Sequence, residues 1–334
     1  EMDRHARFLA KLGVNMVRMH ASLYSKSKTS KITDVNDKEI DGIQRMVAAL
    51  KKQGIYSTIS PFWAHVTAPP SWGIDGYANA QPWGLLFFNE KLQTGYKAWV
   101  KELYTRKSPY TGVALKDEPA VAIIQIKNED SLLFWTMQGI RGPQKKLLGA
   151  KFAQWLIKKY GSLDKAKLAW KGAGHKDDNF AERVVGIYII WEMTRPQKGG
   201  KALRINDETQ FLSETMHSFY KEIADYHRKT LGCRQIINPM NWTSADPVLL
   251  NDAERWSQTA CEVIAVNKYY GGVHTGENSG WRIEPGDRIT NESALHNPER
   301  IPTCLKQVVG HPMLITESTW VPPLLYQSEG PLLI

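Results

Sequence analysis

The sequence has few cysteines, short apolar runs and none of three common nucleotide- or hydrolase-site motifs. Cys233, Cys261 and Cys304 lie far apart and form neither a CxxC pair nor a disulfide framework, so we expect them to be buried small side chains. A membrane helix needs roughly 20 apolar residues in a row, so no membrane span is expected. The absence of GxGxxG, GxxxxGK(S/T) and GxSxG excludes the usual dinucleotide, P-loop and nucleophile-elbow sites.

Basic residues outnumber acidic ones, since 43 Lys and Arg against 34 Asp and Glu give a net charge of +9. They are spread along polar helix faces and form no dense run, and no zinc-finger, RNP or basic-zipper signature is present. We therefore expect a solvated surface and no nucleic-acid partner. The excess positive charge would also attract an acidic polysaccharide.

At 334 residues the chain is long enough for one large α/β barrel or about two average domains. It contains no internal repeat and no low-complexity linker, which favours one catalytic domain over residues 1–334. No signal peptide opens the sequence, and we expect any such segment to lie upstream. The compartment, export included, is therefore left open.

Helical and short strand patterns alternate along the chain, which is typical of a parallel α/β architecture. Periodicity and capping residues predict helices at 3–12, 37–53 and 89–104, and a mainly helical region at 146–232 in which 184–191 is ambiguous. Apolar runs predict strands at 14–20, 55–60, 121–127, 235–238, 263–267 and 313–316.

Each predicted strand is followed by polar or aromatic residues. In a (β/α)8 barrel the active site is built at these carboxyl ends, whereas a doubly wound sheet gathers its site at one switch point. Six such ends favour the barrel. The residues concerned are Arg18, His20, Trp63, His65, Asn128, Glu129, Asn241, Trp242, Asn267, Tyr269 and Glu317.

Two glutamates follow predicted strands directly. Glu129 comes after strand 121–127, and Glu317 comes after strand 313–316. Glycosidic cleavage requires one carboxylic acid to protonate the leaving oxygen and one carboxylate on the opposite face of the sugar. If the strands close into a barrel, the pair predicts glycoside hydrolysis. In a retaining enzyme the two carboxyl groups would be roughly 5–5.5 Å apart.

Five segments carry further patterns, and in sequence order they resemble one known family. They are Asn15-Met16-Val17-Arg18, Ile126-Lys127-Asn128-Glu129, residues 152–170, Asn267-Lys268-Tyr269-Tyr270 and the segment 311–317. Together they resemble clan A of the glycoside hydrolases, the (β/α)8 barrels that include β-galactosidases, β-glucuronidases and mannanases.

The resemblance implies a role for each matched residue. Glu129 would be the acid/base at the end of strand four, and Glu317 the nucleophile at the end of strand seven. Arg18 on strand two would keep Glu317 ionised, because a nearby cation favours a carboxylate. Tyr269 would hydrogen-bond the nucleophile, and Asn128 would contact the 2-hydroxyl of the sugar.

In this register strands one and eight lie outside the chain, so we expect a barrel excerpt that covers strands two to seven. His20 follows Arg18 more closely than the matching histidine does in the clan, and a sugar-binding and a structural role are both open for it. Strand alternation would place Lys127 on the face of Glu129, and its role is also open.

Aromatic and polar residues are expected at the mouth of the barrel. Sugars present C–H faces that stack on aromatic rings, so tryptophans in loops suit a carbohydrate groove, with core packing as the alternative for each ring. Trp72, Trp83 and Trp135 fall in or beside such loops. The residues predicted to bind substrate are His20, Trp63, His65, Asn241, Trp242, Trp281 and Trp320.

The sequence thus predicts a retaining O-glycoside hydrolase that acts on an oligo- or polysaccharide without a cofactor. One alternative is a carbohydrate-binding protein that performs no turnover. Another is a barrel enzyme such as a metal-dependent lyase, but His274, His296 and His311 lack metal-ligand spacing and no metal is predicted. The sugar, its linkage, exo or endo action and the oligomeric state are left open.

Overall fold

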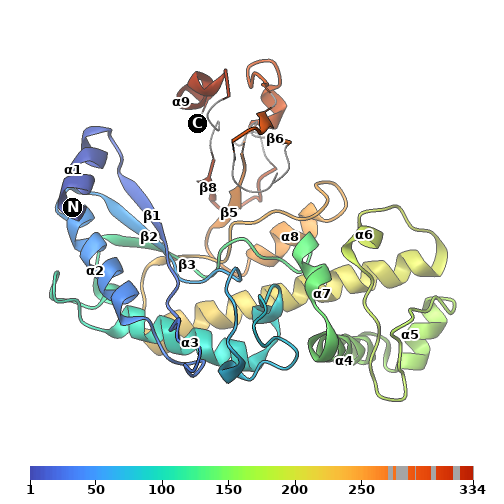
Figure 1. The fold of residues 1–334 in the computed structure, drawn as a ribbon. Helices are drawn as coiled ribbons and strands as arrows, with labels where there is room; N and C mark the ends of the chain where they lie inside the picture. Colours follow the sequence, from blue (N-terminus) through green and yellow to red (C-terminus); the bar gives the residue numbers. More distant parts are fainter. Residues whose placement is uncertain (270–273, 276–284, 290, 302–305, 319–323, 334) are drawn as a thin grey trace. The chain divides into compact units, whose positions relative to one another are not determined.

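Figure 1 shows the chain as a computed structural model, which forms two compact units, Glu1–Val263 and Ile264–Ile334. Each unit is described by itself. The structure describes residues 1–269, 274–275, 285–289, 291–301, 306–318 and 324–333. Tyr270, Trp281, Cys304 and Trp320 lie outside the described residues.

The first unit contains a four-stranded parallel sheet. Its order, β1-β2-β3-β4, follows the chain without the reversal that marks a doubly wound sheet. The strands are short apolar segments that helices join, as parallel pairing requires. They are β1 (Met16–His20), β2 (Tyr56–Ser60), β3 (Val121–Gln125) and β4 (Ile236–Asn238).

Helices connect these strands. Asn36 and Asn89 cap the starts of α2 and α3, where each side-chain oxygen accepts a backbone N–H of the first turn. The helices of the first unit are α1 (Met2–Lys11), α2 (Asp37–Lys51), α3 (Glu90–Thr105), α4 (Gly142–Tyr160), α5 (Leu163–Ala169), α6 (Ile190–Met193), α7 (Gly199–Asp225) and α8 (Asn251–Gln258). A π-helical segment, Tyr226–Leu231, continues α7.

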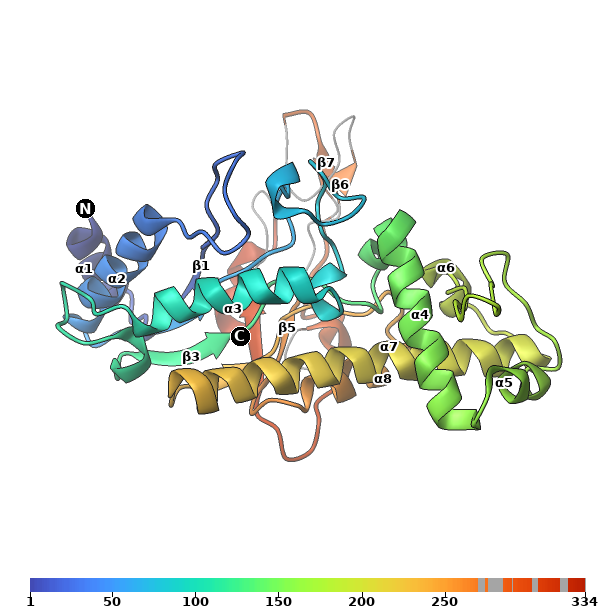
Figure 2. The same cartoon turned by 90° about the horizontal axis from the view of Figure 1, so that it is seen from below.

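Helices α3 and α7 lie side by side (Figure 2), and Lys97 of α3 forms an ion pair with Glu222 of α7 at 2.5 Å. The core between helices and sheet is rich in aromatic rings. Trp72 is 2% exposed and packs against Trp99 with ring centroids 5.5 Å apart. Trp72 is therefore a core residue, which was the alternative that the sequence left open for it.

The second unit contains a parallel pair, β5 (Ile264–Asn267) and β8 (Met313–Glu317). It also contains an antiparallel pair, β6 (His274–Thr275) and β7 (Arg288–Ile289), and the short helix α9 (Gly330–Leu333). The β6–β7 pair was not predicted, since these strands of two residues are too short to leave a periodic pattern.

The parallel α/β class and the six predicted strands are confirmed, with ends that differ by one or two residues. Of the ambiguous stretch 184–191, residues 184–189 are irregular and 190–191 begin α6. Cys233 and Cys261 are buried free cysteines, as predicted. The described strands form no closed barrel, and the barrel, the single domain and the missing outer strands stay predictions. Among the described residues, no helix combines the length and apolarity needed to cross a membrane.

Candidate active site

Three neighbouring strand ends of the first unit build the surroundings of Glu129. The backbone N–H of Asn128 donates to the carbonyl of Phe62, after β2, at 2.8 Å. The backbone N–H of Glu129 donates to Oδ1 of Asn241, after β4, at 2.9 Å. The Asn128-Glu129 dipeptide after β3 is thus held from both sides, with Asn128 buried and Glu129 half-buried.

A chain of hydrogen bonds leads from Arg18 to Glu129. The guanidinium of Arg18 donates from Nε to Oε1 of Gln125 at 2.7 Å and from a terminal nitrogen to Oδ1 of Asn128. Asn241 Nδ2 donates to the same Oδ1 at 2.9 Å. Because two donors meet Oδ1, the amide nitrogen of Asn128 must face the other way, where it lies 3.4 Å from Oε2 of Glu129. Arg18 therefore orients the group that contacts Glu129.

Lys127 lies in the protein interior. Its side chain is fully buried, with Nζ 2.7 Å from Oδ2 of Asp130 and 3.8 Å from the centroid of the Phe87 ring. Burial lowers the pKa of this ammonium group, and the carboxylate of Asp130 opposes that shift. The alternation that would place Lys127 beside Glu129 does not apply, because β3 ends at Gln125.

Four rings gather at the end of β1 and in the segment after β2, and we call them the aromatic cluster: His20, Trp63, His65 and Trp83. Trp63 contacts His65 with centroids 4.8 Å apart, His20 edge-on at 5.7 Å and Trp83 edge-on at 6.1 Å. Trp63 also pairs with Asn128 as neighbouring backbone, so the cluster borders the Asn128-Glu129 dipeptide.

Polar side chains orient three rings of the aromatic cluster. Gln81 hydrogen-bonds Nδ1 of His65 at 2.7 Å and accepts from Nε1 of Trp83 at 2.9 Å. Nδ1 of His20 lies 3.2 Å from the hydroxyl of Ser60. His20 and His65 are exposed while both tryptophans are half-buried, so the cluster presents aromatic edges and faces to solvent.

The two predicted sugar ligands after β4 differ in position. Asn241 is fully buried, and its amide bonds Asn128 and Glu129. We therefore assign it a positioning role in place of direct sugar binding. Trp242 is half-buried and packs edge-on against Phe134 with ring centroids 5.0 Å apart.

In the second unit Glu317 ends β8 opposite Asn267 of β5. The hydroxyl of Tyr269 donates to Oε2 of Glu317. Thr316, one residue earlier, donates to Oδ1 of Asn267 at 2.7 Å. Asn267 and Tyr269 thus fix the end of β8 that carries the predicted nucleophile.

Gln125, Ser60, Gln81 and Asp130 are site residues that the sequence analysis did not single out. For Gln125 the sequence did contain a signal. Gln125 falls at the same alternating positions as Val121 and Ile123, and it is a polar residue in an otherwise apolar run. The other three lie in loops or at strand ends, and each has a partner more than ten positions away: His20 for Ser60, His65 for Gln81 and Gly84 for Asp130.

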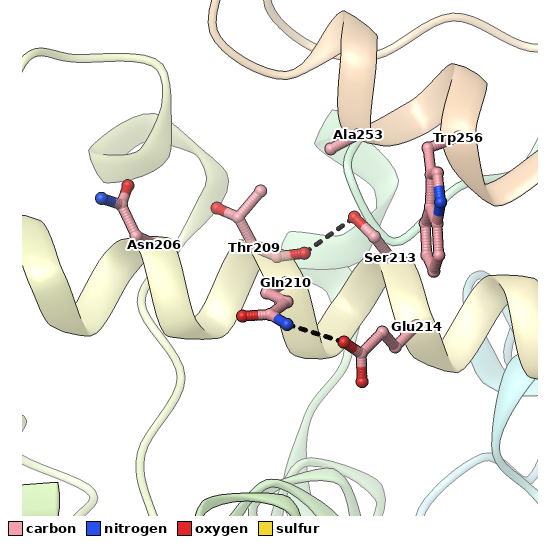
Figure 3. A pocket seen from close by; sticks show the side chains of 7 residues that line it. All are labelled: Asn206, Thr209, Gln210, Ser213, Glu214, Ala253 and Trp256. Carbon is pink, nitrogen blue, oxygen red and sulfur yellow. Dashed lines mark hydrogen bonds between the residues drawn. The ribbon is translucent and has the colours of Figure 1, made fainter. Parts of the chain in front are cut away.

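Two further features of the described residues bear on alternative sites. The described histidines, cysteines and acidic residues form no group of three or more that could hold a metal ion. A pocket of about 360 Å³ lies between α7 and α8 (Figure 3) and contains none of the predicted site residues. Its lining is Asn206, Thr209, Gln210, Ser213, Glu214, Ala253 and Trp256.

No protein-family model and no curated protein matches the chain. Among solved structures it is similar to a GH5_18 protein from Bifidobacterium longum subsp. longum, at 22% identity and a TM-score of 0.30 over 40% of this chain and 29% of that one. An exo-β-agarase matches at 12% identity and a TM-score of 0.47, over 85% of this chain and 35% of the agarase. A β-glucosidase from Exiguobacterium marinum matches at 11% identity and a TM-score of 0.46, over 95% of this chain and 66% of the β-glucosidase.

These solved structures are glycoside hydrolases. The chain spans about a third or less of the length of the first two. With TM-scores below 0.5 the likeness carries no inference about activity, and we base the functional proposal on the residues of this chain.

Proposed function

We propose that this protein is a retaining O-glycoside hydrolase of the (β/α)8 type that acts on an oligo- or polysaccharide. Glu129 is the acid/base and Glu317 the nucleophile. One observation carries the proposal: Tyr269, to which the clan resemblance gives this role, donates a hydrogen bond to Glu317, while Nδ2 of Asn128 in the Asn-Glu motif lies 3.4 Å from Oε2 of Glu129.

In the first step the carboxylic acid of Glu129 gives its proton to the glycosidic oxygen. At the same time a carboxylate oxygen of Glu317 attacks the anomeric carbon, and the bond from that carbon to the leaving oxygen breaks. The leaving group departs as an alcohol, and the sugar is left as an ester on Glu317. The hydroxyl of Tyr269 donates a hydrogen bond to Oε2 of Glu317 and so orients the attacking carboxylate.

In the second step the carboxylate of Glu129 takes a proton from water while the water oxygen attacks the anomeric carbon. The ester bond breaks, Glu317 leaves as a carboxylate, and Glu129 is again a carboxylic acid. Asn128 suits the 2-hydroxyl of the sugar, since its amide nitrogen carries two hydrogens and Glu129 takes only one. That Arg18 reaches Glu317 stays a prediction.

The aromatic cluster favours a carbohydrate substrate of more than one sugar residue. Its rings border the Asn128-Glu129 backbone, so a chain of sugars that is hydrogen-bonded to Glu129 can extend along these rings. Aromatic faces bind the C–H faces of sugars and leave hydroxyls to polar neighbours such as Gln81. The same cluster would serve a carbohydrate-binding protein without turnover, which is the alternative function.

Turnover of a panel of aryl glycosides and polysaccharides separates the two functions. We expect Glu317→Gln to lower kcat by roughly 10³-fold or more, because the amide cannot form the ester. Glu299→Gln, a change of an exposed glutamate in the same unit, is the matched control and should retain full activity.

The stereochemistry of the first product, followed by NMR, tests the mechanism. Retention of configuration is expected, and inversion would remove the nucleophile role of Glu317. Binding of sugars by calorimetry without cleavage of any substrate in the panel would favour the alternative function.

A further inference from the structure

The backbone at Glu129 has a conformation that needs support. Its φ is 35°, in the left-handed region where the Cβ of an L-residue crowds the following carbonyl. This conformation costs about 1–2 kcal/mol for a residue other than glycine. It persists only where surrounding contacts hold it.

Lys127 and Asp130 flank the Asn128-Glu129 dipeptide and form an ion pair with each other. Their ion pair is 2.7 Å long, and both side chains are fully buried. It therefore closes a loop of four residues whose outer members point into the interior. We call this pair the turn clamp.

Asp130 also connects the turn clamp to the aromatic cluster. Its two carboxylate oxygens lie 3.1 and 2.9 Å from the backbone nitrogen of Gly84, which follows Trp83. Gly84 has a φ of 74°, and a Cβ there would lie 2.9 Å from Cδ1 of Ile140, so no other residue fits without a shift. One buried carboxylate thus fixes the turn of Glu129 to the loop of Trp83.

Ser131, the residue after Asp130, is also held by hydrogen bonds. Ser131 is buried, and its hydroxyl donates to the carboxyl group of Glu254 in α8 and accepts the N–H of Leu133 at 2.9 Å. The turn is therefore anchored at positions 127, 130 and 131. Glu129 is the residue of the turn that remains half-exposed.

We infer that Lys127 and Asp130 are positioning residues that hold the left-handed backbone at Glu129 and thereby the direction of its carboxyl group. The inference rests on the acid/base role proposed for Glu129. Buried ion pairs add little net stability, because desolvation offsets their attraction, and apolar residues of similar size would stabilise the fold equally well. The clamp instead provides fixed geometry next to the reacting carboxyl group.

The charge-free double variant Lys127→Met/Asp130→Asn tests this inference. Either single change leaves one buried charge without its counter-charge, whereas the double change removes both charges and should recover most of the lost stability. We expect the double variant to keep a kcat at least tenfold below wild type, with KM within about twofold. Recovery of kcat together with stability would overturn the inference, since the pair would then be merely structural.

Hydrogen exchange measured by mass spectrometry reports how well the backbone of the turn is held, and it needs no substrate. In the double variant the peptide that contains Glu129 should exchange at least tenfold faster, and unchanged exchange would overturn the inference. If the wild type cleaves no glycoside, the proposed function fails while this measurement still decides the clamp.

Two further variants complete the test. Arg204→Met/Asp178→Asn removes another ion pair, of 2.6 Å, whose arginine is fully buried, and should leave the Glu129 peptide and kcat unchanged. If it lowers kcat as much as the clamp variant, the effect is general and the inference fails. Asp130→Asn alone keeps an oxygen for Gly84 but replaces the ion pair with Lys127 by a weaker neutral hydrogen bond, and it serves as a second variant if the double variant does not fold. It should lower kcat by less than the double change, and an unchanged kcat would also overturn the inference.

Discussion

The side-chain oxygen of Asn241 accepts the backbone N–H of Glu129 at 2.9 Å, although 112 positions separate the two residues. The same side chain donates to Asn128 at 2.9 Å. Because β3 and β4 are parallel neighbours, their carboxyl ends meet, and a buried amide after β4 can fix both residues of the dipeptide after β3.

Replacing Asn241 with Ala should lower kcat about 10- to 100-fold. The change leaves a buried backbone N–H without its acceptor and Asn128 with one donor fewer, which also costs about 1–3 kcal/mol of unfolding free energy. Kinetics with an aryl glycoside and urea denaturation measure the two effects. Asn206→Ala, at an exposed position of α7, should change neither, and a wild-type kcat for Asn241→Ala would contradict its positioning role.

Replacing Tyr269 with Phe should lower kcat/KM roughly 10- to 100-fold. The variant loses a hydrogen bond to a charged carboxylate, which is worth about 1.5–3 kcal/mol, and keeps the ring. Steady-state kinetics give the result. Tyr326→Phe, an exposed tyrosine of the same unit, is the control, and equal losses in both variants would refute the predicted role of Tyr269.

Trp63 and Trp72 should respond differently to substitution. Trp63→Ala removes the central ring of the aromatic cluster, and we expect KM for an oligosaccharide to rise by about threefold to tenfold, from a stacking energy of about 0.5–1.5 kcal/mol. Trp72→Phe should lower the melting temperature with little change in KM, since Trp72 is buried in the core. An unchanged KM for Trp63→Ala would show that the cluster binds no sugar.

The stability of the protein should fall as the pH rises from about 4.5 to 8. Burial raises the pKa of Glu208 from 4.5 to about 8, so the folded state keeps a proton that the unfolded state releases. Its contribution to stability is complete below pH 4.5 and is lost as the pH rises through 8, at up to about 1.4 kcal/mol per pH unit. Glu254, whose pKa burial raises to about 7, acts in the same direction.

Glu208→Gln tests this pH dependence because glutamine stays neutral. Relative to wild type, the variant should gain unfolding free energy between pH 5 and pH 8, measured by urea denaturation at both values. The same stability difference at the two pH values would mean that Glu208 does not hold its proton in the folded state.

Local sequence determined the positions of the main elements. Apolar runs such as 121–125 and the capping residues Asn36 and Asn89 act over a few residues, so strands and helix starts can be predicted from them. The same runs placed Glu129 and Glu317 at strand ends, which was enough to select them as candidate catalytic residues.

Only the tertiary structure decided what surrounds these candidates. Asn241, which accepts the backbone N–H of Glu129, lies after β4, and Gln81 joins His65 to Trp83 within a loop that has no periodic pattern. Lys127 turns inward because β3 has already ended and Asp130 offers a buried counter-charge. Such contacts depend on strand order and on loop paths, which are set by packing across the whole fold, whereas periodicity and capping record only the preferences of neighbouring residues.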